Sequence, residues 1–284
     1  MTLQQALLSA ARQLAEDPQL SDTARRDAES LMLHTTGISR AALLADPARL
    51  LTPEQLRSYE ASIARRLRHE PLQYITGAQE FYGLPFRVTP AVLIPRPETE
   101  HLVEAVLERL PHDRSLAIAD IGTGSGAIVC ALATHLPQAN LLALDLSPPA
   151  LEIAQANAVA LNVSERILFV LSDLLDALPR QQRQGAFDAI VSNPPYVPEE
   201  DAAELHPQVR DYEPASALFS GAGGLEIYKR LIPQAHEALK PEGLLALEIG
   251  HGQRDAVAGL LSGWRDVDFV HDLQSIPRVA LARK

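Results

Sequence analysis

Apolar and polar positions along the chain follow two different periods. Over roughly the first seventy residues, apolar side chains recur at helical spacing, and prolines or glycines end each run. Thr52-Pro53-Glu54 opens the last run with a capping residue, a proline at the first helical position and an acid in the first turn. We therefore predict a small all-α bundle over residues 1–72, which recognises the substrate. Its helices are expected from Leu3 to Asp17-Pro18 and at about 23–34, 40–44 and 52–68.

The pattern changes at Pro71. Aromatic and β-branched residues punctuated by glycine occur at 73–77 and 80–83, which favours a β-hairpin within a linker of residues 73–95. From Leu116 onward, short apolar runs alternate with helical patterns, as in a Rossmann-like α/β fold with a mostly parallel sheet and helices on both faces. This domain is expected over residues 96–284, with 198–223 as a long loop beside its site. The expected strands are 116–120, 140–145, 166–171, 187–192, 243–249, 267–271 and 277–282, with shorter ones at 86–88 and 92–94; the expected helices are about 98–110, 126–136, 148–160, 224–239 and 253–261.

Composition agrees with an ordinary soluble protein: 46% of the 284 residues are hydrophobic and 21% are charged. No apolar run is long enough to span a bilayer and no secretory signal is visible, so we expect a cytoplasmic protein without membrane contact. Cys130 lies in an apolar helical pattern and is expected to be a buried, reduced thiol. The net charge of −11 comes from residues 74–284, which disfavours long nucleic acid as a partner. Nothing in the chain requires more than a monomer.

The tetrapeptide Asn193-Pro194-Pro195-Tyr196 follows the apolar run 187–192. Two prolines end strand hydrogen bonding and fix the backbone, and the residue before a proline is extended. We therefore expect Asn193 at the carboxyl end of a strand, which is the sheet edge where α/β proteins bind ligands. There, its side chain and the neighbouring carbonyls form acceptors for a substrate –NH2 group. An ordinary turn would explain Asn-Pro alone, but the second proline and the aromatic residue favour a functional role.

A glycine loop, Gly122-Thr123-Gly124-Ser125-Gly126, joins the first strand of the predicted sheet to its first helix. A glycine triplet is a weak signal alone, but the spacing is G-x-G-x-G, whereas the dinucleotide fingerprint is G-x-G-x-x-G. Asp120 precedes the loop, where it would repel a pyrophosphate and attract a cationic amino-acid group. Both details favour S-adenosylmethionine as the cofactor. Asp145 is expected to bind the ribose or to cap the next helix, and Asp173-Leu174 to meet the adenine or to form a cap or turn.

With these residues the chain resembles the class I S-adenosylmethionine-dependent methyltransferases, and more narrowly the HemK/PrmC family of protein-glutamine methyltransferases. The resemblance covers nearly the whole chain. It implies methylation of the side-chain amide (N5) of the glutamine in the Gly-Gly-Gln motif of class I peptide chain release factors, which supports translation termination. Two positions depart from the family pattern: relatives often carry an acid at Gly223 and some carry an aromatic residue at Leu174. The matching segments are Pro71 to Gly77, Glu80 to Gly83, Leu93 to Glu100, Asp120 to Gly126, Asn193 to Tyr196, Glu213-Pro214 and Glu248 to Gly250.

A glutamine amide nitrogen is a poor nucleophile because its lone pair is delocalised into the carbonyl. We hypothesise that the Asn193 side-chain oxygen and the Pro194 carbonyl accept hydrogen bonds from its two N–H groups, beside the bound cofactor. Pro195 would keep this corner rigid, and Tyr196 would pack against the planar amide. No proton-transfer pair is needed, so His206 and His251 are expected to be surface or packing residues. No cluster has the spacing of metal ligands.

Three other functions remain open at this stage. A nucleic-acid amino-methyltransferase uses the same tetrapeptide on adenine or guanine, but the acidic balance of this chain counts against it. A non-catalytic adenosine-binding protein is possible on the same fold, although the intact acceptor motif beside an intact glycine loop argues against a degenerate site. A nicotinamide-dependent dehydrogenase is the weakest alternative, because the loop spacing is wrong.

Overall fold

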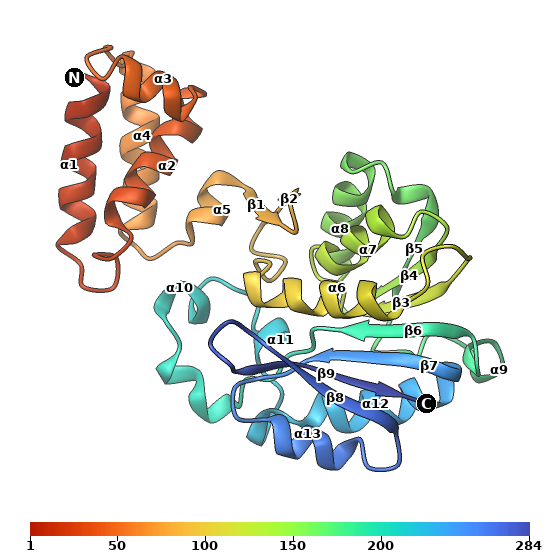
Figure 1. Cartoon of the computed structure of the whole chain (residues 1–284). Helices are drawn as coiled ribbons and strands as arrows, with labels where there is room; N and C mark the ends of the chain where they lie inside the picture. Colours follow the sequence, from red (N-terminus) through yellow and green to blue (C-terminus); the bar gives the residue numbers. More distant parts are fainter. The chain divides into compact units, whose positions relative to one another are not determined.

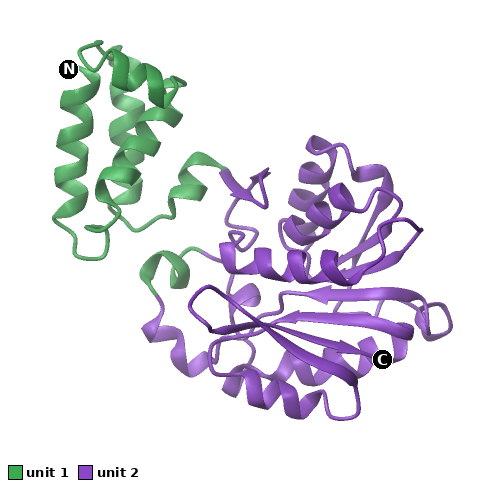
Figure 2. Ribbon diagram, in the orientation of Figure 1, with its two compact units in different colours: residues 1–77, 206–212 green, residues 78–205, 213–284 purple.

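A computed structural model describes all 284 residues. The chain forms two compact units, residues 1–77 with 206–212 and residues 78–205 with 213–284 (Figure 2). None of its helices has the length and apolar character needed to cross a bilayer.

The first unit is a helical bundle, as predicted. Thr52 is the N-cap of α4, and its capping box with Gln55 confirms the helix start read from the sequence. Asp27 of α2 and Arg66 of α4 form a buried ion pair at 2.8 Å, which joins these two helices inside the bundle. The helices are α1 (Leu3–Ala15), α2 (Ala24–Thr36), α3 (Arg40–Ala45), α4 (Pro53–Arg66) and α5 (Leu72–Thr76), and this unit also includes α10 (Pro207–Arg210).

The prediction of a strand at 73–77 is wrong. This segment is the short helix α5, and Gly77 ends it in the left-handed conformation (φ 75°), a common helix C-terminus. The hairpin follows α5 directly, where β1 (Ala78–Phe81) pairs with β2 (Leu84–Arg87). Its turn, Tyr82-Gly83, has positive φ at both residues, which suits the right-handed twist of a two-residue hairpin. Residues 92–94 also form no strand and lead irregularly into α6 (Pro97–Arg109).

The second unit contains the seven-stranded sheet in the order β5-β4-β3-β6-β7-β9-β8. The five strands from β5 to β7 are parallel, and β9 pairs antiparallel with both β7 and β8. The chain runs outward from β3 through β4 to β5 and then returns to β6 on the other side of β3. A topological switch point therefore lies between β3 and β6. The strands are β3 (Ala117–Ile121), β4 (Asn140–Asp145), β5 (Ile167–Leu171), β6 (Phe187–Ser192), β7 (Leu239–Glu248), β8 (Arg265–His271) and β9 (Pro277–Arg283).

Helices cover both faces of this sheet (Figure 1). One apolar cluster packs α6, α7 and α8 against one face, and a second packs α12 and α13 against the other. Cys130 of α7 is buried in the first cluster, as expected. The segment predicted as a long loop, 198–223, contains several short helices. The elements of this part are α7 (Ala127–His135), α8 (Pro148–Ala160), η1 (Ser164–Arg166), α9 (Arg180–Arg183), η2 (Glu199–Glu204), α11 (Ala215–Leu218), η3 (Ala222–Gly224), α12 (Glu226–Ala238) and α13 (Arg254–Leu260).

Candidate active site

The second unit has a cavity of about 400 Å³ at the carboxyl ends of its central strands. Ile121 ends β3, Asp145 ends β4, and Ser192 ends β6, and all three line the cavity. Parallel strands bring their carboxyl ends to one edge, so residues far apart in sequence meet there. The cavity therefore lies where the sequence predicted a ligand site.

Asn193, Pro194 and Pro195 line this cavity directly after β6. The Ser192 hydroxyl donates to the Ile121 carbonyl at 2.6 Å, which ties the end of β6 to the end of β3. The Asn193 amide donates from Nδ2 to the hydroxyl of Thr99 at 3.1 Å. The rigid diproline corner thus begins from an anchored strand end and faces the cavity.

Tyr196 has a different environment from its three neighbours. It is not among the residues that line the cavity, and it packs against the apolar cluster under α12. Its hydroxyl donates to the buried Glu248 carboxylate at 3.3 Å, and its own carbonyl accepts a hydrogen bond from Gln253 at 3.0 Å. Burial raises the pKa of the Tyr196 phenol, so it remains a hydrogen-bond donor at neutral pH. The stacking on a substrate amide that the sequence suggested gains no support from this arrangement.

The glycine loop folds tightly around the ends of β3 and β4. Gly122, Gly124 and Gly126 all have positive φ (72°, 55° and 80°), which glycine adopts at little cost. Gly124 N–H donates to the Asp145 carboxylate at 2.8 Å, and Gly122 N–H donates to the Leu144 carbonyl at 2.8 Å. All five residues from Gly122 to Gly126 were predicted to bind the cofactor; Gly122, Thr123, Gly124 and Ser125 line the cavity, and Gly126 is the N-cap of α7.

Asp145 lines the cavity, but it does not cap the helix that follows. Ser147 is the N-cap of α8, where its side chain accepts from Ala150 N–H. Asp145 instead accepts from the backbone of Gly124 and of Ser147, at 2.8 and 2.9 Å. Burial raises the pKa of Asp145, and these backbone donors oppose the rise. Its neighbour Leu146 lines the cavity with an unusually exposed apolar side chain, which the sequence analysis had not singled out.

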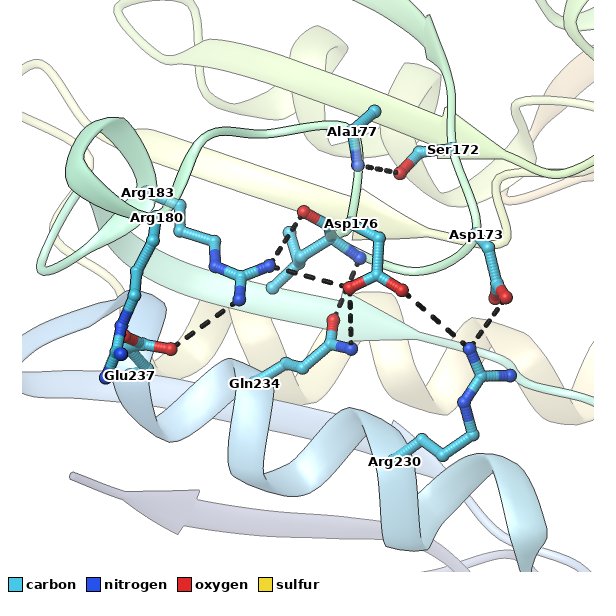
Figure 3. A network of polar contacts seen from close by, with 10 residues as sticks. Ser172, Asp173, Asp176, Ala177, Arg180, Arg183, Arg230, Gln234 and Glu237 are labelled. Carbon is cyan, nitrogen blue, oxygen red and sulfur yellow. Dashed lines mark hydrogen bonds and ion pairs between the residues drawn. The ribbon is translucent and has the colours of Figure 1, made fainter.

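Asp173 and Leu174 also line the cavity, beyond the end of β5. The Asp173 carboxylate forms an ion pair with Arg230 of α12 at 2.7 Å. Leu174 adopts φ 50°, a conformation that non-glycine residues rarely occupy and that surrounding contacts must hold. The next residue, Leu175, is held by a polar network (Figure 3), in which Gln234 of α12 accepts from Leu175 N–H at 3.0 Å and Arg183 of α9 donates to the Leu175 carbonyl at 2.9 Å.

Asp120 has no exposed surface and does not line the cavity. It accepts a hydrogen bond from the Thr123 hydroxyl at 2.7 Å, and its other oxygen has no partner. Burial raises the pKa of Asp120 to about 7, against the hydrogen bond from Thr123. The side chain therefore supports the glycine loop from beneath, and the direct attraction of a cationic ligand group suggested by the sequence does not follow from this geometry.

Two supporting interactions were missed by the sequence analysis. Glu213 is buried and forms an ion pair with Arg96, a cavity residue, while also accepting from Ile94 N–H at 3.1 Å. Asn157 of α8 is likewise buried and donates to the Ser125 carbonyl at 2.8 Å and the Arg87 carbonyl at 3.0 Å. The signal for the first pair was present, since Arg96 and Glu213 both lie in family-matching segments. Their contact, across 117 positions, was not readable from either segment.

Of the two histidines noted in the sequence, His251 is exposed, as expected. His206 belongs to the first unit, where its ring meets His69 edge-on with centroids 6.1 Å apart. No group of three or more histidine, cysteine, aspartate or glutamate residues has the arrangement of a metal site.

Comparisons with known proteins identify the family and the fold. A family model of the PrmC N-terminal domain matches residues 5–77, and a model of the methyltransferase small domain matches residues 99–208. Among solved structures, a methyltransferase from Pyrococcus furiosus has a TM-score of 0.53 and 18% identity, covering 78% of this chain and 98% of its own. A 16S rRNA methyltransferase from T. thermophilus, in complex with AdoMet and guanosine, has a TM-score of 0.53 and 20% identity, covering 73% and 49%. These two structures show the fold alone.

Curated relatives match over almost the full length. The release factor glutamine methyltransferase of Koribacter versatilis is 48% identical over 287 residues, covering 100% of this chain and 99% of that protein. The release factor glutamine methyltransferase of Escherichia coli is 42% identical over 274 residues, covering 96% of each. The chain therefore belongs to the HemK/PrmC family of release factor glutamine methyltransferases, S-adenosylmethionine-dependent enzymes with the class I methyltransferase fold.

Proposed function

We propose that this protein methylates the side-chain amide nitrogen (N5) of the glutamine in the Gly-Gly-Gln motif of class I peptide chain release factors. The substrate comes from the names of its full-length relatives. The observation that carries the chemistry is the position of Asn193 and Pro194, which face the same cavity as the glycine loop. A pair of acceptors beside a cofactor-sized pocket suits transfer to an amide –NH2.

The cavity fits S-adenosylmethionine in size and in chemical character. A volume of about 400 Å³ lies within the usual range for small-molecule sites. The backbone of Gly122 and Gly124 permits close approach, Asp145 offers carboxylate oxygens for ribose hydroxyls, and Leu146 offers an apolar surface for the base. Asp173 and Leu174 would border the adenine. Because the Asp173 carboxylate already pairs with Arg230, we propose that Asp173 lies beside the adenine and do not assign it a direct hydrogen bond to the base.

When bound, the cofactor supplies an electrophilic methyl group on its sulfonium. The chain's own residues position the acceptor nitrogen. The Asn193 side-chain oxygen and the Pro194 carbonyl accept from the two amide N–H groups and favour the positive charge that develops on nitrogen. Alignment of this kind supplies up to about 7–11 kcal/mol of barrier reduction. A methylated, positively charged amide is strongly acidic and loses its proton to water, so the site needs no basic side chain.

The helical unit is proposed to recognise the protein substrate. It includes residues 1–77 and has a buried core of its own, separate from the residues that line the cavity. The match of residues 5–77 to the PrmC N-terminal domain supports this proposal. The net charge of −11 further favours a protein substrate over long nucleic acid.

The test compares wild-type protein with Asn193→Ala, using a purified release factor and S-adenosylmethionine, with modified glutamine mapped by mass spectrometry. Wild type is expected to add one methyl group to the Gly-Gly-Gln glutamine, and none to a release factor carrying Gly-Gly-Glu. Asn193→Ala should lose about 10²-fold or more in kcat while cofactor affinity changes little. Single-stranded DNA and RNA are offered in parallel. Methylation of nucleic acid in place of release factor, or an unchanged rate in Asn193→Ala, would refute the proposal.

A further inference from the structure

Arg96 is the only cationic side chain among the residues that line the cavity, and the reaction described above does not use it. The acidic residues of the same lining are Asp145 and Asp173. S-adenosylmethionine brings a carboxylate of its own into such a site, on its methionine part. Removing a carboxylate from water is costly unless a cation or N–H donors replace the lost hydrogen bonds. The cavity must therefore supply a partner for this anion.

The glycine loop has few N–H groups left for an anion. The N–H groups of Gly122 and Thr123 donate to the Leu144 carbonyl, at 2.8 and 2.9 Å. The N–H of Gly124 donates to the carboxylate at the end of β4, and that of Gly126 donates to the Thr123 carbonyl, each at 2.8 Å. Four of the five N–H groups of this loop are thus satisfied within the protein. The loop gives the cofactor room, and the partner of its carboxylate has to come from another segment.

Arg96 is held by a buried carboxylate that leaves part of its guanidinium free. Glu213, whose side chain is 1% exposed, accepts from Nη2 of Arg96 on one oxygen and from Ile94 N–H on the other, the latter at 3.1 Å. The guanidinium and the backbone two residues before it therefore share one anchor. Nε and Nη1 of Arg96 make no hydrogen bond in the structure, and 31% of the side chain is exposed. A guanidinium has five N–H donors, so it can bind a second carboxylate while it holds the first.

Arg96 lies at the end of the cavity that is left for the methionine part of the cofactor. The adenine is proposed beside Asp173, after β5, and the ribose at Asp145, at the end of β4. In the sheet order β5-β4-β3-β6, the rest of an extended cofactor then falls at β3 and β6. Arg96 is the N-cap of α6, and Thr99 in the first turn of that helix accepts at 3.1 Å from Asn193, which follows β6. The free guanidinium and the methionine part are thus expected at the same end.

The substrate glutamine is a poorer partner for this cation. A guanidinium bonded to the carbonyl oxygen of the acceptor amide would draw the nitrogen lone pair further into the carbonyl. This effect would oppose methyl transfer, because the reaction needs that lone pair on nitrogen. The cofactor carboxylate gains from the same contact and leaves the acceptor amide unchanged.

We propose that Arg96 binds the carboxylate of the cofactor's methionine part through its free N–H groups, while Glu213 holds the guanidinium in place. The contact fixes one end of the cofactor and Asp145 fixes the ribose, so the reactive sulfonium is held between two anchored groups. The inference rests on the proposed placement of the cofactor in this cavity. It gives a function to the Arg96 and Glu213 segments, which the methyl-transfer step leaves unused.

The experiment measures the affinity of the full-length protein for two ligands by calorimetry, S-adenosylmethionine and decarboxylated S-adenosylmethionine. The second ligand keeps the base, the ribose, the sulfonium and the ammonium, and lacks only the carboxylate. Wild type should bind S-adenosylmethionine about 10–100-fold more tightly, the effect of hydrogen bonding to a charged group. In Arg96→Met this preference should fall to within about threefold, because only the binding of the carboxylate is lost.

Two further variants separate this contact from a loss of structure. Arg96→Met leaves Glu213 buried without its cation, which destabilises the protein. The double variant Arg96→Met with Glu213→Gln removes both charges and keeps an acceptor for Ile94 N–H, and it should show the same loss of preference. Arg230→Met is the matched control. It breaks the ion pair with Asp173 at the adenine end, so it should change both affinities by the same factor.

Three results would overturn the inference: a wild-type preference within about threefold, a preference retained by the folded double variant, or a preference lost equally in Arg230→Met. A higher KM for release factor together with a retained preference would place the substrate, and not the cofactor, at Arg96. Folding of each variant is followed by the fluorescence of Trp264, the single tryptophan. Failure of the proposed function looks different, because the binding measurements use no release factor, whereas wild type would then leave the release factor glutamine unmodified.

Discussion

Gly224→Ala offers a sharp test of the link between backbone packing and activity. Gly224 has φ 69°, and a Cβ built there would overlap the Tyr196 carbonyl oxygen, 3.0 Å from the Tyr196 carbonyl carbon and 2.8 Å from Nε2 of Gln253. The adjacent Gly223 has φ 80° and no atom within 4 Å of such a Cβ. The two alanine variants therefore share the same backbone strain and differ in the clash alone.

The expected magnitudes follow from these two causes. Placing alanine in the left-handed region costs about 1–2 kcal/mol, and this applies to both variants. Overpacking adds about 1–3 kcal/mol for Gly224→Ala, because the obstacle is backbone and cannot rotate away. Gly223→Ala should thus lose about 1–2 kcal/mol of stability and Gly224→Ala about 2–5 kcal/mol. The clash also displaces Tyr196, two residues after Pro194, and a shift of about 1 Å at a reacting centre can cost about 10²-fold in rate.

The assay combines urea unfolding with methyl transfer to release factor. Trp264 belongs to the second unit and packs edge-on against His236 with ring centroids 5.0 Å apart, so its fluorescence follows the unfolding of that unit. Rates are compared at urea-free conditions where both variants are folded. If Gly224→Ala matches Gly223→Ala in stability and keeps a rate within about threefold of it, the close packing of η3 against the tetrapeptide is refuted as a determinant of activity.

Three further outcomes are expected. Gly126→Ala should lose about 2–5 kcal/mol in urea unfolding, because its Cβ would lie 3.1 Å from that of Ala154 at φ 80°; a loss under 1 kcal/mol would contradict this. Gln234→Leu, which removes the acceptor for Leu175 N–H, should weaken cofactor binding by about tenfold in calorimetry without lowering kcat at saturation; unchanged affinity would count against it. Burial raises the pKa of Asp120 to about 7, so its contribution to stability is present at acid pH and lost as the pH rises through that value. The stability of Asp120→Asn should consequently fall less than that of wild type between pH 5 and pH 8; equal falls would refute the assignment.

Much of the fold was predictable because local patterns and topology agree in the second unit. Apolar runs of strand length alternate with helical patterns, and β4, β6 and α8 have the bounds that these patterns predict. The hairpin shows the limit of this approach. Residues 73–77 have strand-like composition, yet Gly77 terminates a helical turn there, and Leu72 packs against the helical bundle. Composition over five residues does not decide between helix and strand when tertiary packing favours one of them.

The acids of the site were predicted by position, but their roles depended on which way each side chain points. Asp120 and Asp145 both come at strand ends beside the glycine loop. Asp145 is the last residue of β4 and lines the cavity, whereas Asp120 lies one residue before the end of β3 and points into the protein. Because successive side chains of a strand alternate in direction, a shift of one residue separates a ligand-facing acid from a supporting one. Strand ends read from sequence are not accurate to one residue.

Glu248 could have been found by combining the tetrapeptide with the strand order. In the parallel register of β6 and β7, Ser192 pairs with Leu247, so the next residues, Asn193 and Glu248, lie side by side at this edge of the sheet, with Glu248 as the last residue of β7. An acid at the end of the neighbouring strand therefore lies beside the tetrapeptide, where it accepts from the Tyr196 hydroxyl. Thr99 needs one more step, since it comes from the start of α6, 94 positions before Asn193. Its hydroxyl accepts from Asn193 only after α6 has packed on the sheet, and no local pattern near Thr99 carries that information. The surroundings of the tetrapeptide thus come from three segments that the sequence separates and the fold brings together.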